Sequence, residues 1–145
     1  RSNVKILTIA SIAMSVMFGI MQCFILYGAY QEAAAHAEKA SVDIGKISCI
    51  LMGLLFIILG NFMPKTRTNS IIGVRISWSM YNDTTWQKSN RFGGIALILT
   101  GILTILTAAI LPNSLLSTVL SLLYLTAATT VILIYAHGIY KKEKA

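Results

Sequence analysis

Residues 93–139 read GGIALILTGILTILTAAILPNSLLSTVLSLLYLTAATTVILIYAHGI, and this stretch decides the fold. It contains two long apolar blocks, 93–111 and 115–139, neither of which holds an Asp, Glu, Lys or Arg. About 20 apolar residues, within a range of about 17–25, are enough for a helix to cross the hydrocarbon core of a bilayer. Only Pro112, Asn113 and Ser114 separate the blocks. Such a short connection predicts two transmembrane helices that form an antiparallel hairpin.

Two further apolar blocks, 6–27 and 47–63, precede this hairpin. The block 47–63 is the shortest of the four, so we expect its helix to begin a turn earlier or to lie in a thinned patch of bilayer. Hydrophobic residues make up 56% of the chain and charged residues 12%, against about 25% charged residues in a soluble domain. The sequence therefore predicts an all-α fold. We expect an integral membrane bundle of four transmembrane helices in one membrane domain, 1–145, with a structured loop, 64–92, between the second and third helices.

Lysine and arginine are distributed unevenly between the two sides that these spans define. The side that holds both chain ends and the 64–92 loop carries ten cations: Arg1, Lys5, Lys65, Arg67, Arg75, Lys88, Arg91, Lys141, Lys142 and Lys144. The other side carries Lys39 and Lys46. Because Lys and Arg are in excess in cytoplasmic segments, both ends and the loop are predicted to be cytoplasmic. This topology also accounts for the net charge of +7, so we expect no direct nucleic-acid binding.

The expected outer segment, 31–46, is rich in alanine, which predicts that the first helix continues above the membrane surface. Cys23 and Cys49 both lie in apolar blocks. We expect two buried free thiols, since free cysteine behaves as a small hydrophobe, and a disulfide stays open because both are placed toward the outer side. The chain begins with Arg1 rather than methionine, so we expect a fragment or a missing start, and no segment is typical of a cleavable signal peptide.

The four spans offer little reactive chemistry. Their ionisable imidazole is His137, one turn from the cytoplasmic end of the last block. Charged residues inside a membrane mark proton relays, ion paths and substrate sites, so their absence from these blocks argues against a proton-coupled pump or a membrane-embedded hydrolase. Pairs of small residues, such as Gly94 with Gly101 and Ser117 with Ser121, share a helix face and indicate helix packing. We expect neither a metal nor a cofactor.

The 64–92 loop begins where the second helix must stop. Asn61 lies at the membrane edge, and Pro64 cannot continue the helix. The apolar stretch that follows is too short to span a bilayer, and Gly73 allows a turn within it. Trp78 and Tyr81 are typical of the headgroup level of a membrane.

A short helix is predicted to follow, before the third span begins. Asn82 is a good N-cap, and Asp83 suits the positive end of the helix dipole. Residues three or four apart share a helix face, and two pairs do so here: Trp86 with Asn90, and Lys88 with Arg91.

Two interpretations of this loop compete. In the first, its cations contact lipid phosphates and its tryptophans anchor it to the membrane. In the second, Arg75, Trp78, Trp86 and Arg91 form a fixed recognition surface for a cytoplasmic partner, since Arg and Trp are enriched at interface hot spots and Arg binds carboxylates and phosphates through a planar fork. The residues alone leave this choice open. An enzyme acting on lipid headgroups is disfavoured, because Asp83 is the only acid of the loop and a carboxylate without a histidine partner is poor general acid–base equipment.

The loop resembles the signature of the SdpI family of bacterial membrane proteins, whose type member is the immunity protein against a secreted sporulation-delaying toxin. The matching residues are Gly60, Asn61, Met63, Pro64, Lys65, Asn69, Gly73, Val74, Arg75, Trp78, Ser79, Trp86, Ser89, Asn90, Arg91, Phe92 and Gly94. Two departures stand out: Ile76-Ser77 occupies a place where the family usually has Thr-Pro, and Asn90 one that is often His. The resemblance covers roughly residues 47–140, and the first helix by position only.

The resemblance implies a protein of the bacterial cell membrane with two linked roles. One is protection of the producing cell from a membrane-active peptide toxin on the outer side. The other is signalling, in which the loaded protein sequesters a cytoplasmic repressor at loop 64–92. The candidate partner- or lipid-binding residues are Asn61, Lys65, Asn69, Gly73, Arg75, Trp78, Trp86, Asn90 and Arg91. The alternative, suggested by the small residues of the spans, is a subunit of a membrane transport or export complex.

Overall fold

The computed structural model of the chain describes residues 2–34, 43–69 and 71–144. It contains four long helices: α1 (Ser2–Ala34), α2 (Ile44–Phe62), α3 (Asp83–Ile110) and α4 (Ser114–Lys144). A single 3-10 turn, η1 (Met63–Lys65), follows α2, with Pro64 in its first positions. Each of the four helices is long and apolar enough to cross a membrane. The part of the chain described by the structure is therefore all-helical, as the apolar blocks predict.

Helix boundaries follow from local capping. The Asp43 side chain accepts a hydrogen bond of 3.1 Å from the Lys46 backbone N–H, so α2 begins at Ile44, one turn before the apolar block. At α3, the Asn82 side chain accepts from the Thr85 N–H at 2.7 Å, and the Thr85 hydroxyl accepts from the Asn82 N–H at 3.0 Å. This reciprocal capping box starts the helix at Asp83.

The expected short helix and the expected third span form one continuous helix, α3. The expectation of a separate short helix was wrong because nothing between Asp83 and Gly93 breaks the backbone ladder. Gly93 and Gly94, which are weak helix formers, are held in the helix by burial. A Cβ on Gly93 would lie 2.8 Å from a methyl carbon of Val74, so the loop packs directly on this part of α3.

Paired glycines bring α2 and α3 into backbone contact. A Cβ on Gly60 would lie 2.6 Å from the carbonyl oxygen of Gly94, and a Cβ on Gly53 would lie 2.7 Å from that of Gly101. The two glycines of each helix are seven residues apart, so they fall on one face and form two layers of an antiparallel interface. Gly94 and Gly101 are therefore used inside the chain. They are not free to pack against another subunit. Small residues of this kind in the spans are what suggested the alternative of a transport or export complex.

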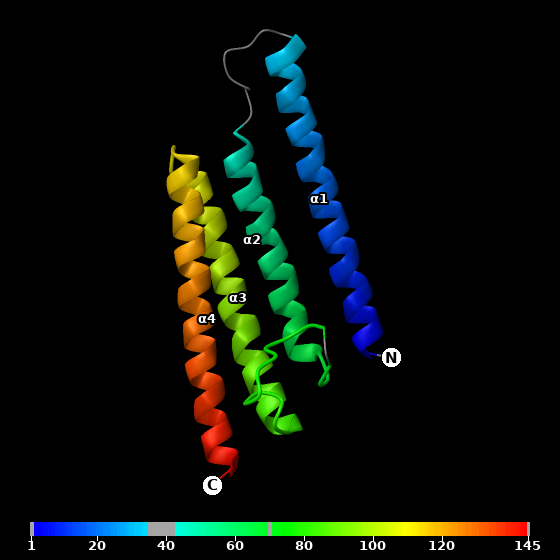
Figure 1. Ribbon diagram of the computed structural model, residues 1–145, viewed down its shortest axis with the longest axis vertical. Helices are drawn as coiled ribbons and strands as arrows, with labels where there is room; N and C mark the ends of the chain where they lie inside the picture. Colours follow the sequence, from blue (N-terminus) through cyan, green and yellow to red (C-terminus); the bar gives the residue numbers. More distant parts are fainter. Residues whose placement is uncertain (1, 35–42, 70, 145) are drawn as a thin grey trace.

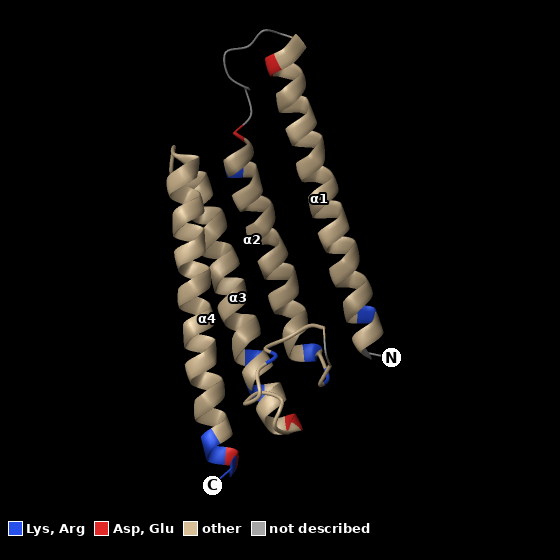
Figure 2. Ribbon diagram, in the orientation of Figure 1, with Lys and Arg blue, Asp and Glu red and all other residues tan. Residues whose placement is uncertain are grey.

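In the view of Figure 1 the helices follow the order α4, α3, α2, α1. The helices α2, α3 and α4 all contact one another, whereas α1 packs on α2 at the edge of the bundle. Both chain ends and the α2–α3 loop lie at the same end of the bundle. We call this the loop end. Most of the described Lys and Arg residues are at the loop end (Figure 2). By the positive-inside rule it stays the end predicted to face the cytoplasm.

Both cysteines are free, and their burial differs. Cys49 is buried, with its Sγ 3.5 Å from the Thr118 hydroxyl of α4. Cys23 is exposed, so the expectation of a buried thiol there was wrong. The reason is that α1 has a neighbour on one side only, and Cys23 lies on its open face. The helix continues beyond the first apolar block to Ala34, while Ala35, His36, Ala37 and Ala40 of the alanine-rich segment lie outside the described residues.

Candidate functional site: the α2–α3 loop

The indole of Trp86 fixes the start of the loop to α3. Trp86 is 1% exposed, and its Nε1 donates a hydrogen bond of 2.9 Å to the carbonyl oxygen of Thr66. Thr66 is itself buried, and its hydroxyl donates to the carbonyl of Met63 at 2.8 Å. A buried indole needs a partner for its N–H, and here the partner lies 20 residues earlier in the chain. The residue immediately after η1 is therefore held against the first turns of α3.

Asn69 shapes the next turn through its side-chain amide. Its Oδ1 accepts hydrogen bonds of 2.8 Å from the backbone N–H groups of Ile71 and Ile72. Its Nδ2 donates to the carbonyls of Arg67 at 2.8 Å and Ile72 at 3.1 Å. Asparagine often closes turns in this way, because its side chain mimics a backbone amide. The amide of Asn69 is thus occupied within the loop, which gives this residue a structural role.

Gly73 and Asn90 form the closest contact between the loop and α3. Gly73 has a φ of 121°, a conformation that L side chains rarely adopt, and a Cβ there would lie 2.3 Å from Asn90 Oδ1. That oxygen accepts a hydrogen bond of 2.8 Å from the Val74 N–H. The Asn90 Nδ2 donates to the Trp86 carbonyl at 3.0 Å. Asn90 is 0% exposed. It therefore binds the loop backbone inside the protein, at a position where there is room only for a glycine.

Ser79 and Thr85 close the second half of the loop. Both are fully buried. The Ser79 hydroxyl contacts the carbonyls of Val74 and Ile76, the latter at 3.0 Å, and the Thr85 hydroxyl donates to the Ser79 carbonyl at 3.0 Å. Neither residue is among the site residues expected from the sequence. The Asn-x-x-Thr spacing of a capping box was the available signal for Thr85, whereas the role of Ser79 depends on how the loop folds.

Contacts with α4 and α1 complete the attachment of the loop. The Trp78 ring lies 4.6 Å from that of His137, and the Tyr81 ring lies edge-on to that of Tyr140 at 5.1 Å. On the other side, the Asn3 side chain of α1 accepts from the Arg67 N–H at 3.0 Å and donates to the Arg67 carbonyl at 3.3 Å. The loop is therefore in contact with α1, α3 and α4 as well as continuous with α2.

The structure divides the expected site residues into two groups. Gly73, Trp86 and Asn90 touch one another inside the protein, and Asn69 holds a turn. Trp86, which one of the two interpretations places in a recognition surface, is buried, because its ring packs against the loop backbone. The second group is exposed and consists of Asn61, Lys65, Arg75, Trp78 and Arg91. Trp78, at 37% exposure, presents part of its ring.

The exposed cations differ in their partners. Lys88, which the sequence places on a face with Arg91, forms an ion pair of 2.9 Å with Glu143 near the end of α4. Among the described residues, Arg75 and Arg91 form no ion pair, and Lys65 lies 5.2 Å from the Phe62 ring. Two guanidinium groups on a fixed surface can bind an acidic partner or lipid phosphates.

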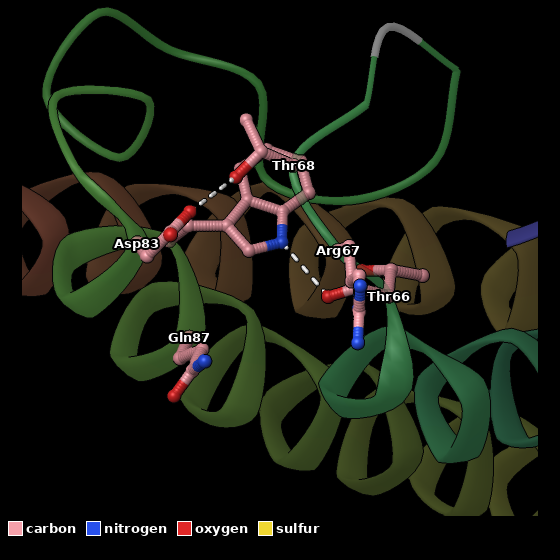
Figure 3. A pocket seen from close by; sticks show the side chains of 6 residues that line it. Thr66, Arg67, Thr68, Asp83 and Gln87 are labelled. Carbon is pink, nitrogen blue, oxygen red and sulfur yellow. Dashed lines mark hydrogen bonds between the residues drawn. The ribbon is translucent and has the colours of Figure 1, made fainter. Parts of the chain in front are cut away.

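A polar cavity of about 430 Å³ opens beside the loop, between the end of η1 and the first turns of α3 (Figure 3). It is lined by Thr66, Arg67, Thr68, Asp83, Trp86 and Gln87. The Thr68 hydroxyl donates to the Asp83 carboxylate across this opening at 3.3 Å. Of these six residues, only Trp86 was among the site residues expected from the sequence. The others were missed because the cavity forms between segments that are separated in the chain.

Comparison with known proteins gives two matches and one negative result. Residues 65–137, half of the chain, match the model of the SdpI/YfhL protein family. A stretch of 60 residues is 35% identical to "Immunity protein SdpI" of Bacillus subtilis (strain 168). That stretch is 41% of this chain and 29% of the relative, so the chain covers less than a third of the relative's length. No solved structure matches this chain.

Proposed function

The chain belongs to the SdpI/YfhL protein family, and we propose that it protects the cell that makes it from a secreted, membrane-active peptide toxin. It is a multi-pass membrane protein, with four helices able to span a bilayer. In the proposed orientation both chain ends and the α2–α3 loop face the cytoplasm, so the connections at the other end meet the toxin. The relative carries the name of an immunity protein, which supports this role.

One observation carries the proposal most strongly: the family match coincides with the part of the chain that holds the loop in place. The match begins at Lys65 and ends at His137. Within those limits lie the bond from Trp86 to Thr66, the contact of Gly73 with Asn90, and the contact of Trp78 with His137. The matched residues therefore include the loop and the parts of α3 and α4 on which it packs. This supports a function in which the loop has a defined shape.

We also propose that the exposed part of the loop sequesters a cytoplasmic repressor once the toxin has been bound. Arg75 and Arg91 are exposed, and neither forms an ion pair among the described residues. Trp78, three residues after Arg75 in the chain, presents part of its ring. Such a combination suits a protein partner with an acidic surface, because Arg and Trp supply most of the binding energy at many interfaces.

A survival assay tests the protective role. A sensitive bacterium expresses this chain, or carries an empty vector, and is challenged with the sporulation-delaying peptide and with other membrane-active peptides. We expect survival with the chain and killing with the empty vector, at a membrane abundance that is measured in parallel. Equal killing in both by every peptide would contradict the proposal.

A second arm of the assay separates protection from signalling. The variant Arg75→Ala removes an exposed cation of the loop, and Lys141→Ala removes a matched exposed cation from the end of α4. If the outer connections carry protection, both variants protect as well as the original chain. If Arg75→Ala alone loses protection at equal abundance, the loop takes part in protection itself, and the assignment of the loop to signalling is wrong.

A further inference from the structure

The polar cavity beside the loop has the dimensions of a ligand site. Its volume of about 430 Å³ falls within the roughly 300–1,000 Å³ that small-molecule sites occupy. One wall comes from residues Thr66 to Thr68, which follow η1, and the other from Asp83 and Gln87 in the first turns of α3. Trp86, whose N–H is already bonded to Thr66, also lines it.

Two opposite charges line this cavity without neutralising each other. Arg67 and Asp83 form no ion pair with one another or with any other residue that the structure describes. The carboxylate of Asp83 has one hydrogen bond, from the Thr68 hydroxyl at 3.3 Å, which leaves most of its acceptor capacity unused. Figure 3 shows Asp83 and Arg67 on opposite sides of the opening. The cavity therefore has a cationic side and an anionic side.

Both sides are held in position by contacts elsewhere. The backbone of Arg67 is fixed at its N–H and its carbonyl by the side chain of Asn3, at 3.0 Å and 3.3 Å. Asp83 is the first residue of a helix that the Asn82–Thr85 capping box starts. Because the backbone is fixed at both residues, a ligand has to order only their side chains.

The place of the cavity narrows the choice of ligand. It lies where α2 has just ended and α3 is beginning, at the loop end of the bundle. From the positions of the apolar spans, we expect that level to lie in the headgroup layer of a membrane. A ligand that matches the cavity needs an anionic group for the fork of Arg67 and a cationic donor for Asp83, and a phosphate joined to a primary ammonium fulfils both requirements.

We propose that this cavity binds phosphoethanolamine, with the phosphate at Arg67 and the ammonium at Asp83. The Thr68 hydroxyl and the Gln87 amide also line the cavity and supply neutral hydrogen-bonding groups. This chemistry is present in the headgroup of phosphatidylethanolamine and in soluble phosphoethanolamine. The proposal goes beyond toxin protection and does not depend on it.

Binding is tested with the full chain in nanodiscs and in detergent. Affinity is measured for phosphatidylethanolamine, for phosphatidylglycerol, and for soluble phosphoethanolamine. Phosphatidylglycerol has the phosphate but no ammonium. We expect the affinity for phosphatidylethanolamine to be about tenfold higher than the affinity for phosphatidylglycerol. One charge-assisted hydrogen bond contributes a free energy that corresponds to a change in affinity of about this size. A response to both ethanolamine compounds identifies the soluble headgroup as sufficient, and a response to the lipid alone identifies the membrane as the source.

Three variants test which of the two charged residues binds the phosphate and which binds the ammonium. Asp83→Asn keeps an acceptor for Thr68 and the helix start, and is expected to abolish the preference while phosphate binding persists. Arg67→Gln is expected to weaken both lipids, and the control Lys141→Gln, an exposed cation of α4 that does not line the cavity, is expected to change neither. Equal affinity of the original chain for both lipids, or an unchanged preference in Asp83→Asn, would overturn the proposal. The proposal would also be overturned if a zwitterion with a carboxylate, such as glycine, bound to the chain and phosphoethanolamine did not.

Discussion

At the scale of single residues, the loop depends on positions where a specific side chain, or its absence, decides the backbone. Gly73 has a positive φ and faces the amide of Asn90, so both its conformation and its space exclude a Cβ. Asn90 in turn needs the loop backbone, because its Oδ1 is buried and accepts from the Val74 N–H. Each residue therefore explains the presence of the other.

Gly73→Ala is expected to destabilise the protein by roughly 1–3 kcal/mol, the usual cost of a strained backbone position that also creates a clash. Thermal unfolding in detergent, followed by circular dichroism or tryptophan fluorescence, measures the change. The control is Gly19→Ala on α1, where a Cβ meets nothing within 4 Å. If the two variants unfold at the same temperature, the contact between Gly73 and Asn90 does not hold the loop.

Ser89 gives the opposite expectation at the same scale. Its hydroxyl is fully buried and has no hydrogen-bond partner among the residues that the structure describes, although Ser89 matches the family pattern. Burying an unpaired hydroxyl costs about 1–3 kcal/mol, so Ser89→Ala is expected to leave the unfolding temperature unchanged or to raise it. A clear fall in that temperature would show that the hydroxyl has a partner in the folded protein.

At the scale of elements, the contact between α2 and α3 is the central one. Their backbones approach through Gly60 with Gly94 and Gly53 with Gly101, so the pair excludes even a methyl group. Helices associate within a membrane through close packing of this kind. Lipid tails are as apolar as the side chains, so there is no hydrophobic driving force for the association. Because α3 also carries Trp86 and Asn90, the same helix pair sets the position of the loop.

Gly94→Ala is expected to separate the two helices, because the new Cβ would lie 2.5 Å from the Gly60 carbonyl oxygen and 3.0 Å from the Pro64 ring. A loss of about 1–3 kcal/mol in stability is typical of overpacking. The unfolding temperature in detergent measures this loss. Gly138→Ala on α4, where nothing lies within 4 Å, serves as the matched helical control. Equal stability of the two variants would mean that the close approach of α2 and α3 is not required.

At the loop end, the Asn3 side chain joins α1 to the loop. Asn3 forms two hydrogen bonds with the backbone of Arg67, while the rest of α1 packs on α2. Asn3→Ala is expected to raise the hydrogen-exchange rate of the Arg67 amide severalfold, because that N–H loses its acceptor. The Trp86 indole N–H, which bonds to Thr66, serves as an internal reference that should not change. An unchanged exchange rate of the Arg67 amide would mean that the Asn3 side chain does not hold the Arg67 backbone.

Sequence patterns predicted the elements better than their contacts. The four helices follow from apolar blocks, and the start of α3 from Asn82, because both are local properties. The burial of Trp86 could not be predicted, since a tryptophan near a membrane edge is equally suited to an interface and to a core. Its partner is the carbonyl of Thr66, which only the folded loop brings within reach. The cavity of Arg67 and Asp83 escaped prediction for the same reason.

At the scale of the whole molecule, the charged and polar features are concentrated at one end of the bundle. The loop end carries most of the described cations, both chain ends, the exposed group of Arg75, Trp78 and Arg91, and the polar cavity. The remaining length of the helices is apolar, with many large side chains facing outward, as a bilayer requires. The proposed signalling role and the proposed orientation therefore depend on each other.

The most direct test of this account asks which side of the membrane the loop faces. In a background with Cys23→Ala and Cys49→Ala, one variant carries Arg75→Cys in the loop, and another carries Glu32→Cys near the opposite end of α1. Whole cells are treated with a membrane-impermeant maleimide before and after permeabilisation. We predict that Glu32→Cys is labelled in intact cells and that Arg75→Cys is labelled only after permeabilisation. Labelling of Arg75→Cys in intact cells would place the loop outside, and would contradict its role as a binding surface for a cytoplasmic repressor.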